Sequence, residues 1–378
     1  MRPLTVLSVS EGALGTEVLG LATAIRGIES ELGGTDEFCA HVECLPPLGR
    51  LQLRLATSFP AIGRLDLDLQ TVRWHAIQAL RARRLVARRI KELSPDVLHV
   101  TSHTISFFLA DIMRAVPTAL SVDTTVWDWR AMEIWRSLRP WSKLMVEPSL
   151  VLERRALRAA SVVLAWSACV RTAVERVEPA AHVVEHHPGV DLARFRPSSR
   201  SPRDRVRILF VGGRFRKKGG EDLIAVLEQD LDRRIELDIV TPEFVPERPG
   251  IRVRRIEWTD PALVEAYQRA DVFCLPTYGD AVPFSVVEAM ACGLPIIASD
   301  VGSIPDLLDY GAAGVLVRPG DLRGLRLAIE ALAGDAAERE RLGEAARAKC
   351  ERSYDLVKQT ARFADLLREI AESGGQRS

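Results

Sequence analysis

Two acidic side chains, Asp280 and Glu288, stand eight residues apart on a segment of unusual composition. Asp280 lies in a loop rich in Pro and Gly after an apolar run that ends at Leu275, and Glu288 lies inside a stretch of small apolar residues. A carboxylate packed against apolar side chains is costly unless it has a partner. The spacing therefore predicts that both acids face one extended ligand, although each acid taken singly is also typical of a solvated surface.

The same segment predicts a helix that begins near Pro283 or Phe284, because Pro is well tolerated in the first helical turn. The unpaired amides and the dipole at a helix N-terminus favour an anion such as phosphate. We therefore expect an anionic group of the ligand to lie at the start of this helix.

Four cations, Arg214, Arg216, Lys217 and Lys218, follow another apolar run and are flanked by two Gly pairs. The segment has no GxGxxG, and no Ser or Thr follows a GK pair, so neither a dinucleotide site nor a P-loop is predicted. Glycines allow the backbone to approach a ligand closely, and cations at a strand end suit a diphosphate held without a metal ion. Arg214 and Lys218 are the stronger candidates for this contact.

Short β-branched runs alternate with longer amphipathic segments along the whole chain, which is typical of βαβ units in parallel sheets. They fall into two groups, so the sequence predicts an α/β protein with two doubly wound domains. Ligands of such sheets bind beyond the carboxyl ends of the strands. The predicted strands are residues 4–9, 97–100, 119–122, 162–165, 207–211, 236–240, 272–275, 296–298 and 314–317.

The domain boundaries follow from local composition. The polar stretch 197–205 contains two Pro and is predicted to link a domain of residues 1–196 to a domain of residues 206–353. Residues 354–372 are expected to form a C-terminal helix, and residues 373–378 a disordered tail.

The overall composition excludes several classes of protein. In 378 residues, 51 Lys and Arg balance 51 Asp and Glu, which argues against a nucleic-acid partner. Six Cys without a CxxC pair predict neither a disulfide scaffold nor a zinc site. No apolar run approaches the ~20 residues of a membrane span. We expect a soluble, cytoplasmic protein.

Three segments together resemble glycosyltransferase family 4, a group of retaining, metal-independent enzymes that use nucleotide sugars and have the GT-B fold. They are residues 207–223, residues 271–302 with their paired acids, and the segment His187–Phe195. The resemblance covers the C-terminal half. It implies two Rossmann-like domains facing across a cleft, the first binding an acceptor and the second a nucleoside diphosphate sugar, with no cofactor and no metal ion.

The resemblance also implies roles for individual residues. Arg214 and Lys218 would bind the donor diphosphate, Glu288 the nucleotide ribose, and Asp280 the hydroxyls of the donor sugar, where the family usually has the longer Glu. The last helix would cross back onto the first domain. The backbone expected along the donor is that of Gly213, Val282, Pro283, Phe284 and Ser285.

In the first half of the chain, Gly15 lies in the segment Glu11–Glu17, which resembles the glycine-rich first loop of the family, although an ordinary turn explains it equally well. Asp123 follows a predicted strand at a position where several relatives have a His near the reacting centre. The resemblance therefore makes Asp123, with Asp280, Arg214 and Lys218, a candidate catalytic residue.

Residues 72–93 predict a helix with Leu80 and Val86 on its apolar side and seven Arg or Lys elsewhere. Such a helix is typical of peripheral contact with an anionic membrane face, and equally of a solvated basic surface.

We predict a retaining glycosyltransferase of the hexosyltransferase type. Its acceptor would be the hydroxyl of a glycan, a glycolipid or a small-molecule glycoside. The alternatives are a sugar-nucleotide epimerase of the same fold and a nucleotide-sugar binding protein without catalysis.

Overall fold

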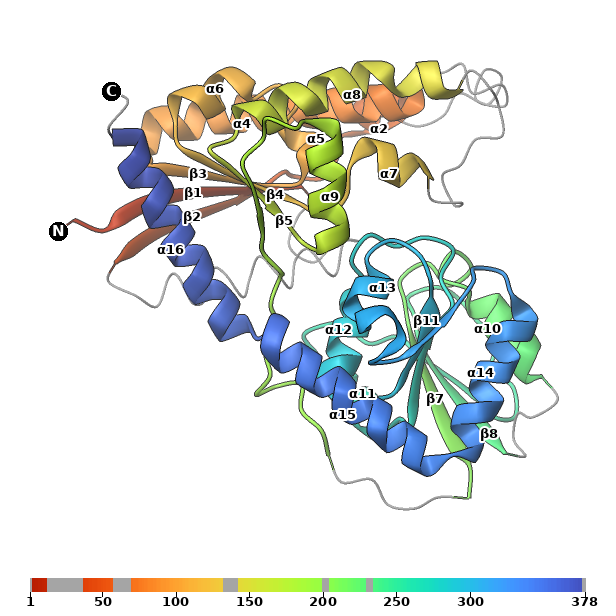
Figure 1. Ribbon diagram of the computed structural model, residues 1–378. Coiled ribbons are helices and arrows are strands. Elements are labelled where there is room, and N and C mark those ends of the chain that lie inside the picture. Colours follow the sequence, from red (N-terminus) through yellow and green to blue (C-terminus); the bar gives the residue numbers. More distant parts are fainter. Residues whose placement is uncertain are drawn as a thin grey trace.

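The computed structural model describes residues 2–11, 37–56, 69–131, 142–198, 204–228 and 234–375 (Figure 1). These residues contain two parallel sheets of six strands each, which confirms the predicted pair of Rossmann-like domains. The first sheet has the order β2-β1-β3-β4-β5-β6 and the second the order β12-β11-β10-β7-β8-β9.

The strands of the first sheet are β1 (Leu4–Ser10), β2 (Phe38–Cys44), β3 (Val97–Thr101), β4 (Thr118–Val122), β5 (Val162–Ala165) and β6 (Val183–Glu185). Those of the second are β7 (Val206–Val211), β8 (Ile235–Val240), β9 (Ile251–Arg254), β10 (Val272–Leu275), β11 (Ile296–Ser299) and β12 (Val315–Val317).

The helices in the first half of the chain are α2 (Arg50–Ala56), α4 (Gln70–Leu93), α5 (His103–Ser106), α6 (Ala110–Ala115), α7 (Val126–Ala131), α8 (Ser142–Ala159) and α9 (Ala168–Val177). Those in the second half are α10 (Gly220–Leu227), α11 (Pro261–Arg269), α12 (Phe284–Ala291), α13 (Ile304–Leu307), α14 (Leu322–Gly334), α15 (Ala336–Ser353) and α16 (Leu356–Gly375).

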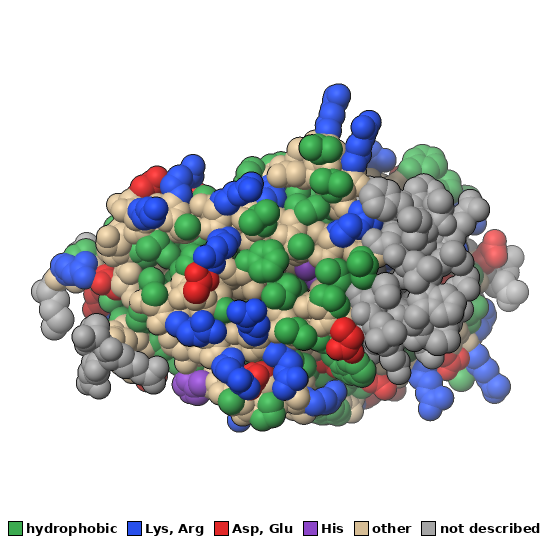
Figure 2. All heavy atoms as spheres, turned by 90° about the horizontal axis from the view of Figure 1, so that it is seen from above, with side chains coloured by type: hydrophobic (Ala, Val, Ile, Leu, Met, Phe, Trp, Pro, Cys, Tyr) green, Lys and Arg blue, Asp and Glu red, His purple; other side chains and the backbone are tan. Residues whose placement is uncertain are grey.

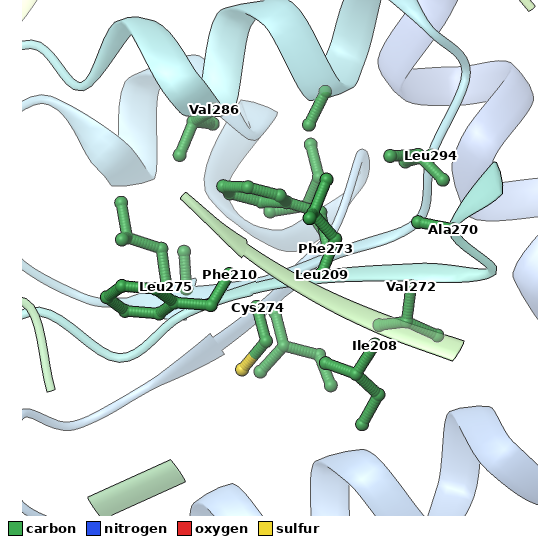
Figure 3. Close-up of a cluster of buried hydrophobic side chains, with 14 of the residues drawn as sticks. Ile208, Leu209, Phe210, Ala270, Val272, Phe273, Cys274, Leu275, Val286 and Leu294 are labelled. Carbon is green, nitrogen blue, oxygen red and sulfur yellow. The ribbon is translucent and has the colours of Figure 1, made fainter. Parts of the chain in front are cut away.

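Helices cover both faces of each sheet. In the second domain, the strands β7 and β10 lie at the centre of one core, where Phe210 and Phe273 pack among aliphatic side chains from the neighbouring elements (Figure 3). In the first domain, Ala82 and Val86 of α4 pack on one face of the sheet. The opposite face is covered by α16, whose Phe363 is 1% exposed.

The chain crosses between the domains earlier than predicted. Val190 and Phe195 belong to the core of the second domain, so the crossing precedes the expected linker at residues 197–205 and the first domain ends before residue 196. The reason is that the Phe195 side chain is buried in the core of the second domain. Its backbone is held there as well, because Arg347 donates a hydrogen bond to the Phe195 carbonyl oxygen at 3.1 Å. Residues 199–203 lie outside the described residues.

The C-terminal helix passes from the second domain to the first (Figure 1). It runs to Gly375, so residues 373–375 are helical instead of part of the disordered tail that the sequence predicts. At the crossing, the Val190 amide donates to the Tyr354 carbonyl oxygen at 2.7 Å, which pairs the two connecting segments. A Cβ at Gly189 would lie 2.4 Å from Leu356 Cα, so only Gly allows this close approach.

Each sheet has a point where its strand order reverses, between β1 and β3 in the first and between β7 and β10 in the second. Loops at the carboxyl ends of such strand pairs diverge and leave room for a ligand. The topology therefore places the expected ligand site at the loops after these strands.

Candidate functional site

The turn after β7, residues 212–219, carries the four predicted cations. It is closed by hydrogen bonds from the Lys218 amide to the Arg214 carbonyl oxygen at 2.8 Å and from the Phe215 amide to the Glu243 carboxylate at 3.1 Å. Gly219 has a φ of +77°, and a Cβ there would lie 2.0 Å from the Pro276 carbonyl oxygen. Glycine is therefore required where this turn meets the neighbouring loop.

The loop after β10, residues 276–283, is bonded to that turn. The Tyr278 amide donates to the Lys217 carbonyl oxygen at 3.1 Å, and the Tyr278 hydroxyl donates to Asp222 at 2.5 Å. On its other side, the Ser303 amide donates to the Ala281 carbonyl oxygen at 3.1 Å. Loops from three adjacent strands, β7, β10 and β11, thus hold one another in place.

The two loops meet in an ion pair between Lys218 Nζ and Asp280 Oδ2. These are two of the four predicted catalytic residues, and they lie 62 positions apart in the sequence. The side chains are 23% and 14% exposed, so the pair is partly shielded from water but remains accessible. A cation and a carboxylate side by side can bind a ligand that carries both negative charge and hydroxyl groups.

The helix α12 begins at Phe284, with Pro283 as its N-cap residue, as the sequence predicts. The Val286 amide donates to the Pro283 carbonyl oxygen at 3.0 Å and so begins the hydrogen bonding of the helix. The amides that precede it, at the start of α12, have no acceptor within the helix. Val282, Pro283 and Phe284 are buried and Ser285 is partly buried. The amide end of α12 therefore lies directly after the loop that carries Asp280.

The other cations of the turn differ in exposure. Arg214 and Arg216 are exposed, and Arg216 pairs with Glu221 at 3.4 Å. Lys217 is half-buried, and burial and the nearby Arg214 charge lower its pKa. No atom lies within 4 Å of a Cβ built on Gly213, so the backbone there is open to a ligand.

Glu288 is buried in the second turn of α12. Its Oε2 accepts a hydrogen bond from the Tyr267 hydroxyl at 2.7 Å. Burial raises the pKa of the Glu288 carboxyl to about 7, while the Tyr267 hydrogen bond and the Arg194 charge lower it. The carboxyl is therefore held by Tyr267 from α11.

Asp123 follows β4 in the first domain and is partly buried. Burial, and to a smaller extent the negative charges of Glu11 and Asp280, raise its pKa to about 6. Asp280 belongs to the second domain, so the two predicted acids interact electrostatically across the domain boundary. The first domain thus presents a carboxyl group towards the ion pair of the second.

Glu11 follows β1, and sequence reasoning assigned it no role beyond its place in a glycine-containing segment. Its carboxylate accepts hydrogen bonds from Ser102 at 3.1 Å and from Gln78 at 3.3 Å, and burial raises its pKa. Its position at the carboxyl end of a strand beside the reversal of strand order was the signal that could have identified it.

The structure thus brings Lys218, Asp280 and Asp123 towards one place and puts Arg214 on the same turn, while Glu288 lies deeper, against Tyr267. Gly15 lies outside the described residues. Tyr267 and Glu243, which hold predicted site segments, were missed because nothing near them in sequence marks them. Within the described ranges, no three His, Cys, Asp or Glu side chains are grouped so as to hold a metal ion.

Residues 205–335 match the family described as Glycosyl transferases group 1. The chain is 28% identical over 298 residues to a sulfoquinovosyl transferase of Arabidopsis thaliana, a match that covers 71% of this chain and 56% of that protein. It is 26% identical over 316 residues to the alpha-maltose-1-phosphate synthase of Mycobacterium tuberculosis, covering 72% of this chain and 79% of that enzyme. The chain therefore spans little more than half the length of the plant relative.

The fold matches that of the Anabaena protein HepE in complex with UDP, with a TM-score of 0.69 and 17% sequence identity. This match covers 97% of the present chain and all of the other chain. The same two-domain arrangement is therefore present in both proteins.

Proposed function

The chain belongs, through residues 205–335, to the group 1 glycosyl transferases and has their GT-B fold, and on that premise we propose that it is a retaining, metal-independent glycosyltransferase. It would transfer a hexose from a nucleoside diphosphate sugar to a hydroxyl of a glycan, glycolipid or small-molecule glycoside. The observation that carries this proposal is the ion pair between Lys218 and Asp280 at the meeting point of the loops after β7 and β10.

The diphosphate is the leaving group and gains negative charge as the bond between the sugar and phosphate oxygen breaks. Lys218, with Arg214 on the same turn and the amides at the start of α12, would stabilise that charge without a metal ion. Fixed donors of this kind need no reorganisation during the reaction. On donor binding, the Lys218 ammonium would exchange its contact with Asp280 for a phosphate oxygen.

The sugar ring gains positive charge in the same step. Asp280 and Asp123 would lie on the sugar side, Asp280 at the donor hydroxyls and Asp123 towards the acceptor. Glu288 would exchange its Tyr267 hydrogen bond for the ribose hydroxyls. We assign no side chain as nucleophile, so retention would come from acceptor attack on the face that the diphosphate leaves, with a phosphate oxygen taking the acceptor proton.

A thermal-shift screen against UDP-, GDP-, ADP- and dTDP-sugars tests donor binding first. We expect one nucleotide to raise Tm in the presence of EDTA, and UDP is bound by the Anabaena protein of the same fold. NMR of the product from that donor and an acceptor mixture should show the anomeric configuration of the donor. Inverted product, or activity lost in EDTA and restored by Mg²⁺, would contradict the proposal.

The same reaction separates the two alternatives. An epimerase would convert the donor sugar with no acceptor present. A non-catalytic binding protein would show a higher Tm with its nucleotide sugar but would release no nucleoside diphosphate. Release of the nucleotide only when an acceptor is added supports transfer.

We also propose that α4 and the adjoining α2 contact an anionic membrane face. Leu51, Leu53 and Leu55 of α2 and Leu80 of α4 are exposed, and both helices also carry exposed arginines. Figure 2 shows hydrophobic and basic side chains interspersed on one face of the molecule. The predicted apolar side of α4 is wrong at Leu80, because α4 turns His75, Gln78, Ala79, Ala82 and Val86 inwards. No helix of the described residues is long and apolar enough to cross a membrane.

This contact is tested by sedimentation with vesicles of anionic and of zwitterionic phospholipid at low and high salt. Each Lys or Arg near an anionic surface contributes about 1 kcal/mol, so binding should require anionic lipid and weaken with salt. Replacing Leu51 and Leu53 by Ser should reduce binding, whereas replacing the exposed Val357 of α16 should not. An unbound protein at low salt would contradict the membrane contact and leave the proposed transfer reaction unaffected.

A further inference from the structure

The segment Trp166–Ala168 of the first domain reaches the second domain directly after β5. Trp166 is held rigidly within its own domain: its amide donates to the Val122 carbonyl oxygen at 3.0 Å, and its carbonyl oxygen lies 3.0 Å from His187 Nδ1. Val122 is the residue before Asp123. The backbone of Trp166 is therefore bonded to the last residue of β4, directly before a candidate catalytic acid.

The indole of Trp166 contacts the loop that carries Asp280. It packs edge-on against Phe284, with ring centroids 6.1 Å apart and ring planes at 82°. Trp166, Val282 and Phe284 form a buried cluster of their own, made of one residue from the first domain and two from the second. Trp166 is 6% exposed, so the contact has excluded most of the water around the ring.

A second contact holds the other flank of the same loop. The Ala168 amide, at the start of α9, donates to Asp306 Oδ2 at 3.0 Å. Asp306 lies on α13, and Ser303, the N-cap residue of α13, donates both its amide and its hydroxyl to the Ala281 carbonyl oxygen. The first domain thus touches the start of α12 through Trp166, and through Asp306 it touches the segment that holds Ala281.

We propose that Trp166 is a positioning residue for the loop of residues 280–284 and for the first turn of α12. Its indole keeps Val282 and Phe284 in place, and it thereby aligns Asp280 and the helix amides with Asp123 on the first domain. The functional part of this inference rests on the proposed transfer reaction. The structural part, that the loop is held from the first domain, does not.

Hydrogen–deuterium exchange of the ligand-free protein tests the structural part without a substrate. The reporters are the amides of Val286 and Val287, which bond to the Pro283 carbonyl oxygen. In Trp166→Ala we expect these amides to exchange about tenfold faster. The reason is that opening of the first turn of α12 would no longer have to break the packing of the indole on Val282 and Phe284. Trp166→Phe keeps an aromatic ring against Phe284 and should remain within about twofold of wild type.

Phe38→Ala is the matched control, because Phe38 is 7% exposed in the first domain but packs at β2, under α16. It should lower Tm as Trp166→Ala does and leave the exchange of Val286 and Val287 unchanged. Equal exchange in wild type and Trp166→Ala, or an equal rise in both Ala variants, overturns the proposal.

Asp306 supplies a second variant that keeps the test decisive if Trp166→Ala does not fold. Asp306→Ala should speed exchange of the same two amides about threefold, and Asp306→Asn, which retains an acceptor oxygen for Ala168, should not. If Trp166→Ala does not fold, unchanged exchange in Asp306→Ala overturns the inference that the first domain holds this loop.

Kinetics with the donor identified by thermal shift tests the functional part. Trp166→Ala should lower kcat about tenfold while the Kd of that donor stays within about threefold, because misalignment affects the reacting geometry more than the cations that bind phosphate. A Phe38→Ala enzyme should keep its kcat. If the wild-type protein transfers sugar from none of the donors, the proposed function fails, but the exchange experiment still decides whether Trp166 holds the loop.

Discussion

The two parallel sheets differ in strand order, and the loops at their carboxyl ends differ in the charged groups they carry. At the second sheet, Lys218 and Arg214 stand on the turn after β7, and Lys218 is paired with Asp280. At the first sheet, Glu11 follows β1 and Asp123 follows β4, and both have a raised pKa. The strand ends of the two domains therefore carry different groups. We call the turn with Arg214 and Lys218 the cationic side, and the carboxyl groups of Glu11 and Asp123 the acidic side.

The contrast matches the two charges that develop when a sugar leaves a diphosphate. Cations belong where the leaving group becomes more negative, and carboxylates where the ring becomes positive and the acceptor loses its proton. A fold with two Rossmann-like domains can separate these tasks because each sheet brings its own loop ends. Single substitutions can neutralise the cations of the second domain or the carboxyl groups of the first domain independently.

Neutralising the cationic side should have the largest effect. Lys218→Ala removes the charge expected at the leaving group, and we expect kcat/KM to fall about 10²- to 10³-fold, the usual loss for one fixed electrostatic donor. Initial rates over a range of donor concentrations measure it.

Arg216→Ala is the matched control for Lys218. Its side chain is 84% exposed on the same turn and pairs with Glu221, so its loss should change kcat/KM less than threefold. Wild-type activity in Lys218→Ala would show that the Lys218 charge has no part in the reaction.

Neutralising the acidic side should have a smaller effect that depends on pH. The pKa of Asp123 is raised to about 6, so a role that needs the ionised carboxylate predicts activity that rises with pH through about 6. Asp123→Asn should lower kcat/KM about 10²-fold and abolish this acidic limb. Asp111→Asn is the control, because Asp111 pairs with Arg83 and its pKa is lowered to about 2. An acidic limb that persists in Asp123→Asn assigns the titration to another group.

The second domain also contains a carboxyl group, that of Glu288, whose ionisation is disfavoured by burial. Its pKa rises from 4.5 to about 7 on folding, so the folded state binds more protons than the unfolded state between these values. The stabilising contribution is present below pH 4.5 and is lost as pH rises through about 7, with an upper limit of about 3 kcal/mol.

Glu288→Gln removes that dependence. Between pH 5 and pH 8, the Tm of wild type should therefore fall relative to the Tm of Glu288→Gln, measured by thermal unfolding without ligand. Glu265→Gln is the control, since Glu265 is 55% exposed on α11 and pairs with Arg269. Parallel Tm profiles for wild type and Glu288→Gln would show that Tyr267 keeps this carboxyl ionised in the folded state.

The central strands and the site loops of the second domain were predictable because their sequence is locally consistent. The runs that end at Val211 and Leu275 are apolar on both faces, and Gly, Pro and charged residues follow them at once. The strands that sequence reasoning missed, β2, β6 and β9, all lie at sheet edges. Their side chains are mostly half-buried, so polar and apolar residues do not alternate regularly along these strands. Only pairing with a neighbouring strand makes them extended.

Partners at long sequence distance were not predictable. Tyr267 faces Glu288 because α11 packs beside α12, and Glu243 holds the Phe215 amide across β7 and β8. Neither residue has a motif of its own. The interaction of Asp123 with Asp280 depends on how the two domains face each other, which no local pattern encodes.

The smallest expected effect concerns backbone access on the cationic side. A Cβ at Gly213 meets no atom within 4 Å, so Gly213→Ala should change the free energy of unfolding by less than about 0.5 kcal/mol. If the donor diphosphate approaches this backbone closely, the added methyl group should raise the donor KM about three- to tenfold at constant kcat, because it weakens binding in ground and transition states alike. Gly219→Ala provides the contrast on the same turn: with a φ of +77° and a Cβ 2.0 Å from the Pro276 carbonyl oxygen, it should lower Tm whether or not donor is present. An unchanged donor KM in Gly213→Ala would mean that the diphosphate does not approach the Gly213 backbone. The groups that bind the diphosphate would then be Lys218 and the amides at the start of α12.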